Sequence, residues 1–511
     1  MGVEPFFITG DTMTEFLPVL AHIFSMQTLV LTTFGTLLGI ALGAAPGLSG
    51  PIGVALLLPL TYGFDPADGL LMLGGIYMGS TYGGSIASIL LNCPGTGEAS
   101  CTALDGYPMA RQGKAKAALY CSVIASSFGG LVGVLALIFL TPLLAGAALR
   151  FGPPEMLLVA MTGLTIVGGF SGKKLSRAMF ALCLGVLLSL VGSDIAGGGY
   201  RFTFGIRELR AGITLIPLVV GLFAITEMIV LLVPPARSTL ALKEERYSLL
   251  AGLRETWRYA GTLIKSTLIG IGIGILPGTG GAVAAFVAYG EARRSSRHPG
   301  KFGNGTPEGI IAPESANNAA VGGSLVPLLA LGIPGSASAA IIYGALTIHD
   351  IIPGPGLLIH SADTAYTFML GMLLTVVIMF VCGILGVRLI ANVLKLPPAY
   401  LISSVLVLTS IGVYSMRNSL FDLMLAFVFG MLGLLFRKLD VPPAPVLLGH
   451  ILGPLVVENF RRSLVLAGAQ GSTIGEFILM RPLALALFVV FLCMLYANFK
   501  HLLGGRRGKR I

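Results

Sequence analysis

Long apolar runs alternate with short polar stretches along the whole chain of 511 residues. Many runs reach the roughly 20 residues that a helix needs to cross a bilayer. They predict spans near 18–44, 69–91, 117–149, 154–170, 178–192, 213–233, 260–276, 318–333, 336–348, 365–394, 398–416, 419–436 and 483–499. We therefore expect an all-α polytopic membrane protein with about 12 transmembrane helices, some of them broken or re-entrant.

Composition supports this class, because 55% of the residues are apolar and only 11% are charged. Soluble domains carry about 25% charged residues. The net charge of +10 lies in short loops and near the C-terminus, so it predicts topology and contact with anionic lipid rather than nucleic acid.

A Gly/Pro motif occurs twice within the apolar sequence. It is Gly39-x3-Gly43-x2-Pro46-Gly47-x2-Gly50 in the first half and Gly270-x3-Gly274-x2-Pro277-Gly278-x2-Gly281 in the second. A second pair follows, at Pro94-Gly95-Thr96-Gly97 and Pro334-Gly335-Ser336-Ala337-Ser338. We call residues 46–51, 94–97, 277–281 and 334–338 the first, second, third and fourth breaks. Paired breaks of this kind predict a transporter built from two repeats, with its substrate between them.

Positive charges predict that the two repeats have opposite orientation. No Lys or Arg precedes Arg111, and none lies between Lys301 and Arg388. The first repeat follows an acidic tail and is followed by basic residues, whereas the second follows a basic loop and ends without them. Because basic loops stay in the cytoplasm, the pattern predicts inverted repeats with the N-terminus in the periplasm and the C-terminus in the cytoplasm.

The same pattern predicts the organisation of the chain. The N-terminal stretch has no Lys or Arg, so we expect no signal peptide and a first span that stays in the membrane. The expected segments are a periplasmic tail at 1–18, the first repeat and following helices at 19–234, a basic cytoplasmic loop at 235–259, the second repeat at 260–397, C-terminal helices at 398–499 and a basic cytoplasmic tail at 500–511.

The breaks are candidate binding sites, because each one exposes backbone N–H groups at a helix start and carbonyls at a helix end. Pro51 suits a first helical position, with Ser49 or Gly50 near the cap. Since the repeats have almost no cationic side chains, an anion would be held by N–H groups at helix starts, by hydroxyls including Ser338, by Asn92 and by a co-bound cation. The predicted substrate residues are Gly47, Ser49, Gly50, Asn92, Pro94, Gly95, Thr96, Gly278, Thr279, Gly280, Pro334, Gly335 and Ser336. The alternative is that these glycines and prolines are kinks that let helices pack.

A second set of residues is a candidate for cation coupling. Glu98 and Glu314 lie nearest the repeat motifs, and Asn317 and Asn318 follow Glu314. Ionisable groups at membrane depth are functional candidates, and Na⁺ would also suit the carbonyls at the breaks. Each group could instead cap a helix or line a wet vestibule.

The sequence contains no motif for metal binding, redox chemistry or nucleotide binding. The six cysteines form no C-x2-C pair, the six histidines lack metal-ligand spacing, and no phosphate-binding G-x4-G-K-[ST] loop occurs. We expect neither an enzyme nor a cofactor other than the coupling cation, Na⁺ or H⁺.

Several motifs carry a family resemblance over nearly the whole chain. They are Asn92-Cys93-Pro94-Gly95-Thr96, Asp105-Gly106-Tyr107-Pro108, Ala312-Pro313-Glu314-Ser315-Ala316-Asn317-Asn318 and Gly332-Ile333-Pro334-Gly335. With them the chain resembles the TctA-type large permease subunits of bacterial tripartite tricarboxylate transporters.

The resemblance implies an elevator-like secondary transporter that imports carboxylates across the inner membrane. It also implies two partners, a small TctB-type membrane subunit and a periplasmic TctC-type binding protein, and a second copy of the chain is a further candidate partner. Members of such systems handle different carboxylates, so the resemblance gives a substrate class only.

Two other functions stay open at this point. The chain could be an ion or proton antiporter, or a channel, with Glu98 and Glu314 as carriers and no organic substrate. It could also be a membrane scaffold or receptor, although its polar loops offer little surface for a partner.

Overall fold

The computed structural model describes residues 12–45, 49–92, 95–169, 175–194, 199–231, 247–393, 406–407, 409–411, 413–415 and 417–504. Two predicted site residues, Gly47 and Pro94, lie outside these residues. So do most of the predicted N-terminal tail, much of the basic loop that begins at 235, most of the predicted span 398–416 and the end of the basic C-terminal tail.

The described chain is almost entirely helical. The helices of the first half are α1 (Thr12–Ile23), α2 (Met26–Ala44), α3 (Gly50–Leu57), η1 (Leu58–Gly63), α4 (Pro66–Leu91), η2 (Glu98–Ser100), α5 (Ala103–Arg111), α6 (Ala115–Ala148), α7 (Pro153–Gly169), α8 (Leu175–Ser189), η4 (Glu208–Ala211), α9 (Leu215–Val219), η5 (Val220–Ile225) and α10 (Thr226–Leu231). Strands β1 (Gly192–Asp194) and β2 (Gly199–Arg201) form an antiparallel hairpin in which Ser193 pairs with Tyr200.

The second half is built in the same way. Its helices are α11 (Leu249–Arg258), α12 (Ala260–Ile275), α13 (Gly280–Ser295), η6 (Pro299–Lys301), α14 (Glu308–Leu331), α15 (Ala337–Ile348), α16 (Leu357–His360), α17 (Ala362–Val393), α19 (Leu420–Lys438), α20 (Ala444–Ala469), α21 (Ile474–Leu479) and α22 (Pro482–Gly504).

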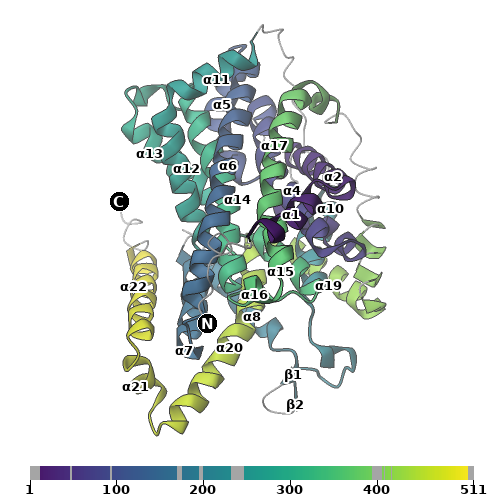
Figure 1. The fold of residues 1–511 in the computed structure, drawn as a ribbon, viewed down its shortest axis with the longest axis vertical. Coiled ribbons are helices and arrows are strands. Elements are labelled where there is room, and N and C mark those ends of the chain that lie inside the picture. The colour runs from purple at the N-terminus through teal and green to yellow at the C-terminus, as the bar shows by residue number, and fades with distance from the viewer. Residues whose placement is uncertain are drawn as a thin grey trace.

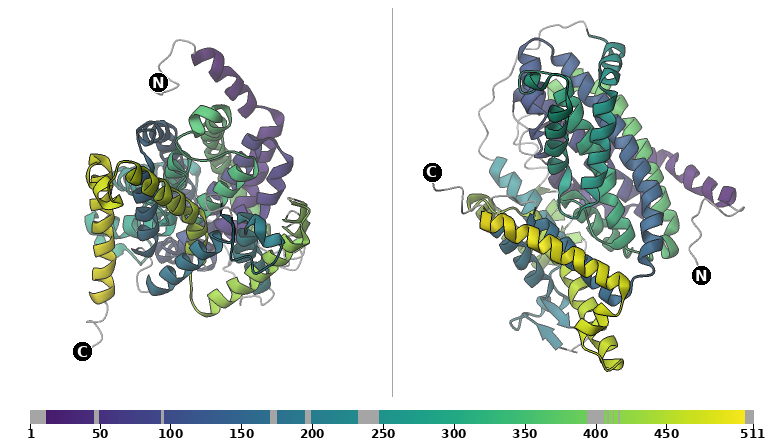
Figure 2. Two further views of the ribbon diagram at one scale, coloured as in Figure 1. Left: turned by 90° about the horizontal axis from the view of Figure 1, so that it is seen from below. Right: turned by 90° about the vertical axis from the view of Figure 1, so that its left-hand side faces the viewer.

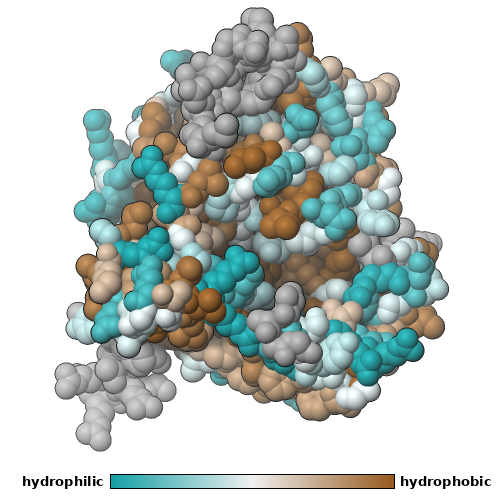
Figure 3. Space-filling view, turned by 60° about the horizontal axis from the view of Figure 1, so that its bottom comes forward, coloured by the Kyte–Doolittle hydropathy of each residue, from teal (hydrophilic) through white to brown (hydrophobic). Residues whose placement is uncertain are grey.

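Among the described residues, four helices are long and apolar enough to cross a membrane: 26–44, 115–148, 362–385 and 420–438. Large apolar side chains also remain exposed, including Phe139 and Leu143 on α6 and Leu385 on α17. Figure 3 shows apolar residues spread over much of one face, between clusters of polar residues. An all-α membrane protein is therefore confirmed, and the number of spans stays a prediction.

Several segments differ from the predicted spans; α14, for example, begins at Glu308 rather than at 318. The predicted span 18–44 is two helices, because Ser25 ends the first run and its hydroxyl accepts a hydrogen bond (3.2 Å) from the Thr28 N–H at the start of α2. Helix α20 was not among the predicted spans. Pro454 and the charged Glu458, Arg461 and Arg462 interrupt its apolar pattern, although the helix is continuous for 26 residues.

The long helices α4, α6, α14 and α17 run through the middle of the molecule, with α11, α12 and α13 along one side (Figure 1). Helix α22 lies apart from this bundle and packs against α7, whereas α1 projects from another edge (Figure 2). The hydrophobic core lies where α4 and α14 meet their neighbours, and both helices are buried along almost their whole length.

Small residues let these central helices approach closely. A Cβ atom at Gly43 of α2 would lie 2.2 Å from the Ser80 carbonyl oxygen of α4. In the second half, a Cβ atom at Gly270 of α12 would lie 2.2 Å from the Ala316 carbonyl oxygen of α14. Such backbone contacts are typical of membrane helices that associate through small residues. The two halves thus use the same packing between equivalent helices.

Two glycines of α12 give a matched test of this packing. Gly270→Ala forces a methyl group into the α14 backbone and is expected to destabilise the fold by about 1–3 kcal/mol. Gly272→Ala is the control, because no atom lies within 4 Å of its Cβ position and alanine favours the helix by about 1 kcal/mol. Thermal melting of the purified protein in detergent should show a lower Tm only for Gly270→Ala; equal melting of both variants would contradict the packing.

Candidate functional site

The first and third breaks each separate a helix from the next one in its half. Helix α3 begins with Ser49 as its N-cap residue and Pro51 in its first turn, so the predicted start of this helix is confirmed. In the second half, α12 ends at Ile275 and α13 begins at Gly280. The Thr279 hydroxyl donates to the carbonyl oxygens of Ile273 (2.6 Å) and Leu276 (2.9 Å). These two carbonyls therefore already have a partner within the protein.

The second and fourth breaks have matching backbone geometry. Helix α4 ends at Leu91 and α14 ends at Leu331, and the cap residues that follow, Asn92 and Gly332, are both left-handed, with φ of 51° and 72°. The Thr96 hydroxyl then accepts a hydrogen bond from the Ala99 N–H (3.3 Å). The Ser336 hydroxyl accepts one from the Ala339 N–H (3.1 Å) at the start of α15. Asn92 thus serves as a helix cap, and its side chain is exposed.

In the first half, the second break packs against α2, which is the helix before the first break. In the second half, the fourth break packs against α12, which is the helix before the third break. A Cβ atom at Gly95 would lie 1.8 Å from the Gly43 carbonyl oxygen, near the end of α2. A Cβ atom at Gly335 would lie 2.3 Å from the Gly274 carbonyl oxygen, near the end of α12. Both glycines are required by these close approaches, because any side chain would collide with backbone.

Between the halves, the breaks meet in crossed pairs. The Cβ position of Gly50 in the first break lies 3.4 Å from Ser338 Oγ in the fourth break and 2.8 Å from Ser80 Oγ of α4. The Cβ position of Gly281 in the third break lies 3.1 Å from the carboxyl carbon of Glu98, just after the second break. The structure therefore brings all four breaks together.

The two crossed pairs differ in charge. Ser338 and Glu98 each follow the capping hydroxyl of their break by two residues, so they occupy equivalent places. At the second and third breaks, the protein's own carboxylate lies beside the start of α13. At the first and fourth breaks, hydroxyls take that place beside the starts of α3 and α15, whose N-terminal N–H groups favour an anion.

A tyrosine connects the first half to the fourth break. The Tyr77 hydroxyl of α4 is hydrogen-bonded to Ser336 Oγ (2.8 Å) and Ser324 Oγ (3.1 Å), and all three side chains are buried. This contact fixes the cap of α15 to the central helix. Neither Tyr77 nor Ser324 was predicted as a site residue.

Glu314 is fully buried in a cluster of hydroxyls, which we call the Glu314 cluster: Glu314, Thr102, Ser122, Ser126 and Ser85. Thr102 donates to one carboxylate oxygen, and Ser126 (2.8 Å) and Ser122 (3.4 Å) donate to the other. Ser85 is hydrogen-bonded to Ser122 (2.6 Å). No Lys or Arg pairs with Glu314 among the described residues. A buried carboxylate without a cation is costly, so the site suits a bound cation or proton.

Asn317 and Asn318 lie one turn beyond Glu314 and are fully buried. The Asn318 amide donates to the Asn317 side-chain oxygen (2.8 Å), which leaves Asn317 Nδ2 and Asn318 Oδ1 without partners in the described chain. Glu98 Oε2 is likewise buried and unpartnered there. Three of the four predicted cation-coupling residues therefore have a buried polar atom available to a ligand.

Sequence reasoning missed the hydroxyl residues that surround these groups. On α4 the polar residues Tyr77, Thr81, Ser85 and Ser88 recur at helical spacing within an apolar helix, and all four are buried. That periodicity was the available signal for a polar stripe turned inward. Thr102, Ser122 and Ser126 offered no comparable signal, because their contact with Glu314 depends on the tertiary fold.

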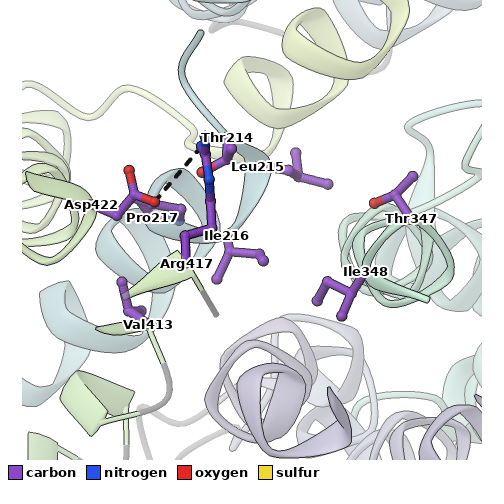
Figure 4. A pocket seen from close by; sticks show the side chains of 9 residues that line it. All are labelled: Thr214, Leu215, Ile216, Pro217, Thr347, Ile348, Val413, Arg417 and Asp422. Atoms are coloured by element: carbon purple, nitrogen blue, oxygen red, sulfur yellow. Dashed lines mark ion pairs between the residues drawn. The ribbon is translucent and has the colours of Figure 1, made fainter. Parts of the chain in front are cut away.

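One cavity lies beside the end of α15, and another lies beside the first break. One, of about 280 Å³, is lined by the start of α9, the end of α15 and α19, and we call it the Arg417 cavity. Figure 4 shows Thr347 and Ile348 on one side of it and the Arg417–Asp422 ion pair (3.8 Å) on the other. The other cavity, of about 380 Å³, is lined by Ser49 and Ile52 at the first break and by Glu227 and Arg437, and we call it the Arg437 cavity.

The described residues contain no group of three His, Cys, Asp or Glu side chains that could hold a metal ion. A transition-metal centre therefore has no support in this part of the chain. Alkali-cation binding by hydroxyl, amide and backbone oxygens is a different chemistry and is compatible with the buried groups described above.

Comparison with known proteins gives two kinds of match. Residues 29–448 match the profile of the tripartite tricarboxylate transporter TctA family. A relative from Agrobacterium vitis, described as an uncharacterized 52.8 kDa protein in the TAR-I ttuC' 3' region, is 36% identical over 477 residues, which is 93% of each chain. A second relative from the same organism, an uncharacterized protein in the TAR-II ttuC' 3' region, is 35% identical over 195 residues, covering 38% of this chain and 81% of its own length. No solved structure matches.

Proposed function

The chain belongs to the tripartite tricarboxylate transporter TctA family, and from this premise we propose that it is the large membrane subunit of a binding-protein-dependent secondary transporter. It imports a carboxylate across the bacterial inner membrane, driven by a Na⁺ or H⁺ gradient. The N-terminus lies in the periplasm and the C-terminus in the cytoplasm, as the distribution of basic residues favours. It is not an enzyme.

One observation carries this proposal, namely the meeting of the first and fourth breaks. There the starts of α3 and α15 approach each other around Gly50, Ser80 and Ser338. Free N–H groups and hydroxyls at two helix starts suit a carboxylate without any cationic side chain. Ser49, Gly50, Gly335 and Ser336 are the predicted residues nearest this point, and we assign them to the substrate.

The equivalent place at the second and third breaks has a different role. Glu98 already supplies a carboxylate beside Gly281, so a substrate anion would be repelled there. Five of the predicted substrate residues therefore shape the place where the second and third breaks meet: Gly95, Thr96, Gly278, Thr279 and Gly280. Asn92 caps α4. A cation bound to Glu98 Oε2 would complete the charge balance beside the substrate.

The repeats support alternating access. Equivalent contacts at Gly43 and Gly274, and at Gly95 and Gly335, occur in both halves, and the basic residues predict opposite orientation. An inverted repeat of this kind lets one set of helices move against the other, and we assign it an elevator-like movement in which the moving helices carry the substrate site. A TctB-type subunit, a TctC-type binding protein that delivers the carboxylate, and a second copy of this chain are the partners we assign.

The second candidate function is an ion or proton antiporter, or a channel, without an organic substrate. The Glu314 cluster favours it, because a buried carboxylate held only by hydroxyls can carry a proton or a cation across the membrane. The two functions differ in whether carboxylate binding remains when Glu314 is neutralised.

The principal test is uptake. Membrane vesicles that contain the three subunits should accumulate labelled citrate or succinate when a Na⁺ or H⁺ gradient is imposed, and vesicles without the binding protein should not. Absence of saturable uptake of any labelled mono-, di- or tricarboxylate under either gradient would exclude the proposed function.

Glu314→Gln separates the two candidates. We expect this variant to lose dependence on the cation gradient, at least about tenfold in initial rate, because the amide cannot carry the charge that the cation balances. Carboxylate binding, measured by protection against thermal unfolding, should remain. Glu458→Gln is the control, since Glu458 pairs with Arg462 on the exposed surface of α20. Loss of ion flux in a protein that never binds a carboxylate would favour the antiporter.

Pro334→Ala tests the fourth break. Proline disfavours helical continuation because it has no N–H donor, so alanine should favour an extension of α14 that covers the N–H groups at the start of α15. We expect transport to fall by more than about tenfold while membrane insertion and yield are kept. Pro46→Ala makes the corresponding change at the first break, although Pro46 lies outside the described residues. Normal uptake by both variants would make the breaks packing features only.

A further inference from the structure

We propose that Arg437, which lies outside both repeats, binds a carboxylate group of the substrate in the Arg437 cavity, and that Glu227 occupies this position when substrate is absent. The inference rests on the proposed function and deepens it. It adds a cationic side chain and an internal competitor to a site for which the sequence predicted helix starts, hydroxyls, Asn92 and a co-bound cation as ligands.

The cavity connects the first break to the end of α19. Ser49 and Ile52 line it from the start of α3, Leu222 and Phe223 line it from η5, and Arg437 lines it from the last turn of α19. The remaining lining is Thr226, Glu227, Gly433, Asp440, Val441, Pro442 and Pro443. Ser49, the N-cap of α3, therefore opens onto a mostly apolar space that holds a guanidinium group.

Arg437 is engaged through only one of its nitrogens. Its Nη1 atom donates to both carboxylate oxygens of Glu227, each at 2.9 Å. Its Nε and Nη2 atoms have no hydrogen-bond partner in the described part of the chain, and 53% of the side chain is exposed. Because a guanidinium has five donors and binds carboxylates through pairs of parallel hydrogen bonds, a paired face remains available for a ligand.

Glu227 shows that the Arg437 guanidinium binds a carboxylate in this cavity. Its side chain is 21% exposed and lines the cavity, and its carboxylate is held by Arg437. A substrate carboxylate has the same charge and the same oxygens, so it can take the place of Glu227 on the guanidinium. The other acidic residue of the cavity, Asp440, is paired with Arg177 at 2.8 Å. Arg437 is thus the cation of the cavity whose partner the substrate can replace.

Variants of Arg437 and Glu227 distinguish the proposal from a purely structural role of their ion pair. If the pair only holds α10 to α19, Arg437→Gln and Glu227→Gln break the same interaction and should cause the same defect. If Glu227 competes with substrate, its neutralisation should favour substrate binding, whereas loss of Arg437 should weaken it.

The experiment uses the complete three-subunit transporter in proteoliposomes with labelled citrate, succinate and acetate as probes. Arg437→Gln should raise the KM for citrate and succinate by about tenfold or more. Arg437→Lys should fall between this variant and the wild type, because lysine keeps the charge but not the paired donors. Glu227→Gln should lower the KM severalfold.

Arg177→Gln is the matched control. It breaks the Arg177–Asp440 pair at the rim of the same cavity and should leave the KM within about twofold of the wild-type value. Saturable wild-type uptake with an unchanged KM in Arg437→Gln would overturn the inference alone. So would equal losses in Arg437→Gln and Glu227→Gln. A wild-type transporter that takes up none of the probes would instead count against the proposed function itself.

Discussion

Backbone N–H and C=O groups cannot be left without partners inside a bilayer, and the arrangement of this molecule depends on that constraint. Four helix breaks would be unstable if each faced hydrocarbon. Here they face one another: Gly95 and Gly335 pack against carbonyls near the ends of α2 and α12, and Gly50 approaches Ser338. Hydroxyls supply the caps, as at Thr96 and Ser336. A polar centre inside an apolar protein is therefore a consequence of breaking the helices in matched pairs.

The two crossed pairs of breaks share their geometry and differ in one chemical group. Glu98 and Ser338 occupy equivalent places after their capping hydroxyls, but only Glu98 carries charge. The second and third breaks therefore contain a carboxylate of the protein, and in the proposed function the first and fourth breaks offer their helix starts to the substrate anion. In the proposed function these two places hold a cation and a carboxylate, which is the pairing that a cation-coupled carboxylate transporter requires.

Local sequence signals predicted the local features of this site. Pro51 and Ser49 marked the start of α3, and Gly/Pro pairs marked every break, because cap and turn chemistry involve only neighbouring residues. The Glu314 cluster could not be predicted in the same way. Thr102, Ser122 and Ser126 come from η2–α5 and α6 and reach Glu314 on α14 only after these helices pack. Helix α20 was missed because its prolines and charges resemble a loop when packing is ignored.

The scarcity of cationic residues in the repeats predicts that helix starts, hydroxyls, Asn92 and a co-bound cation hold the substrate anion. Helix starts give orientation and partial charge, but they cannot bind a second or third carboxylate at a distance. The Arg437 cavity changes this view, because it places a guanidinium outside the repeats yet open to Ser49. The starts of α3 and α15, which move with the repeats, and Arg437 on α19 would then bind the same substrate anion. Such a division lets the repeats move while the charge that attracts the substrate stays on α19, and Glu227 keeps that charge neutralised between transport cycles.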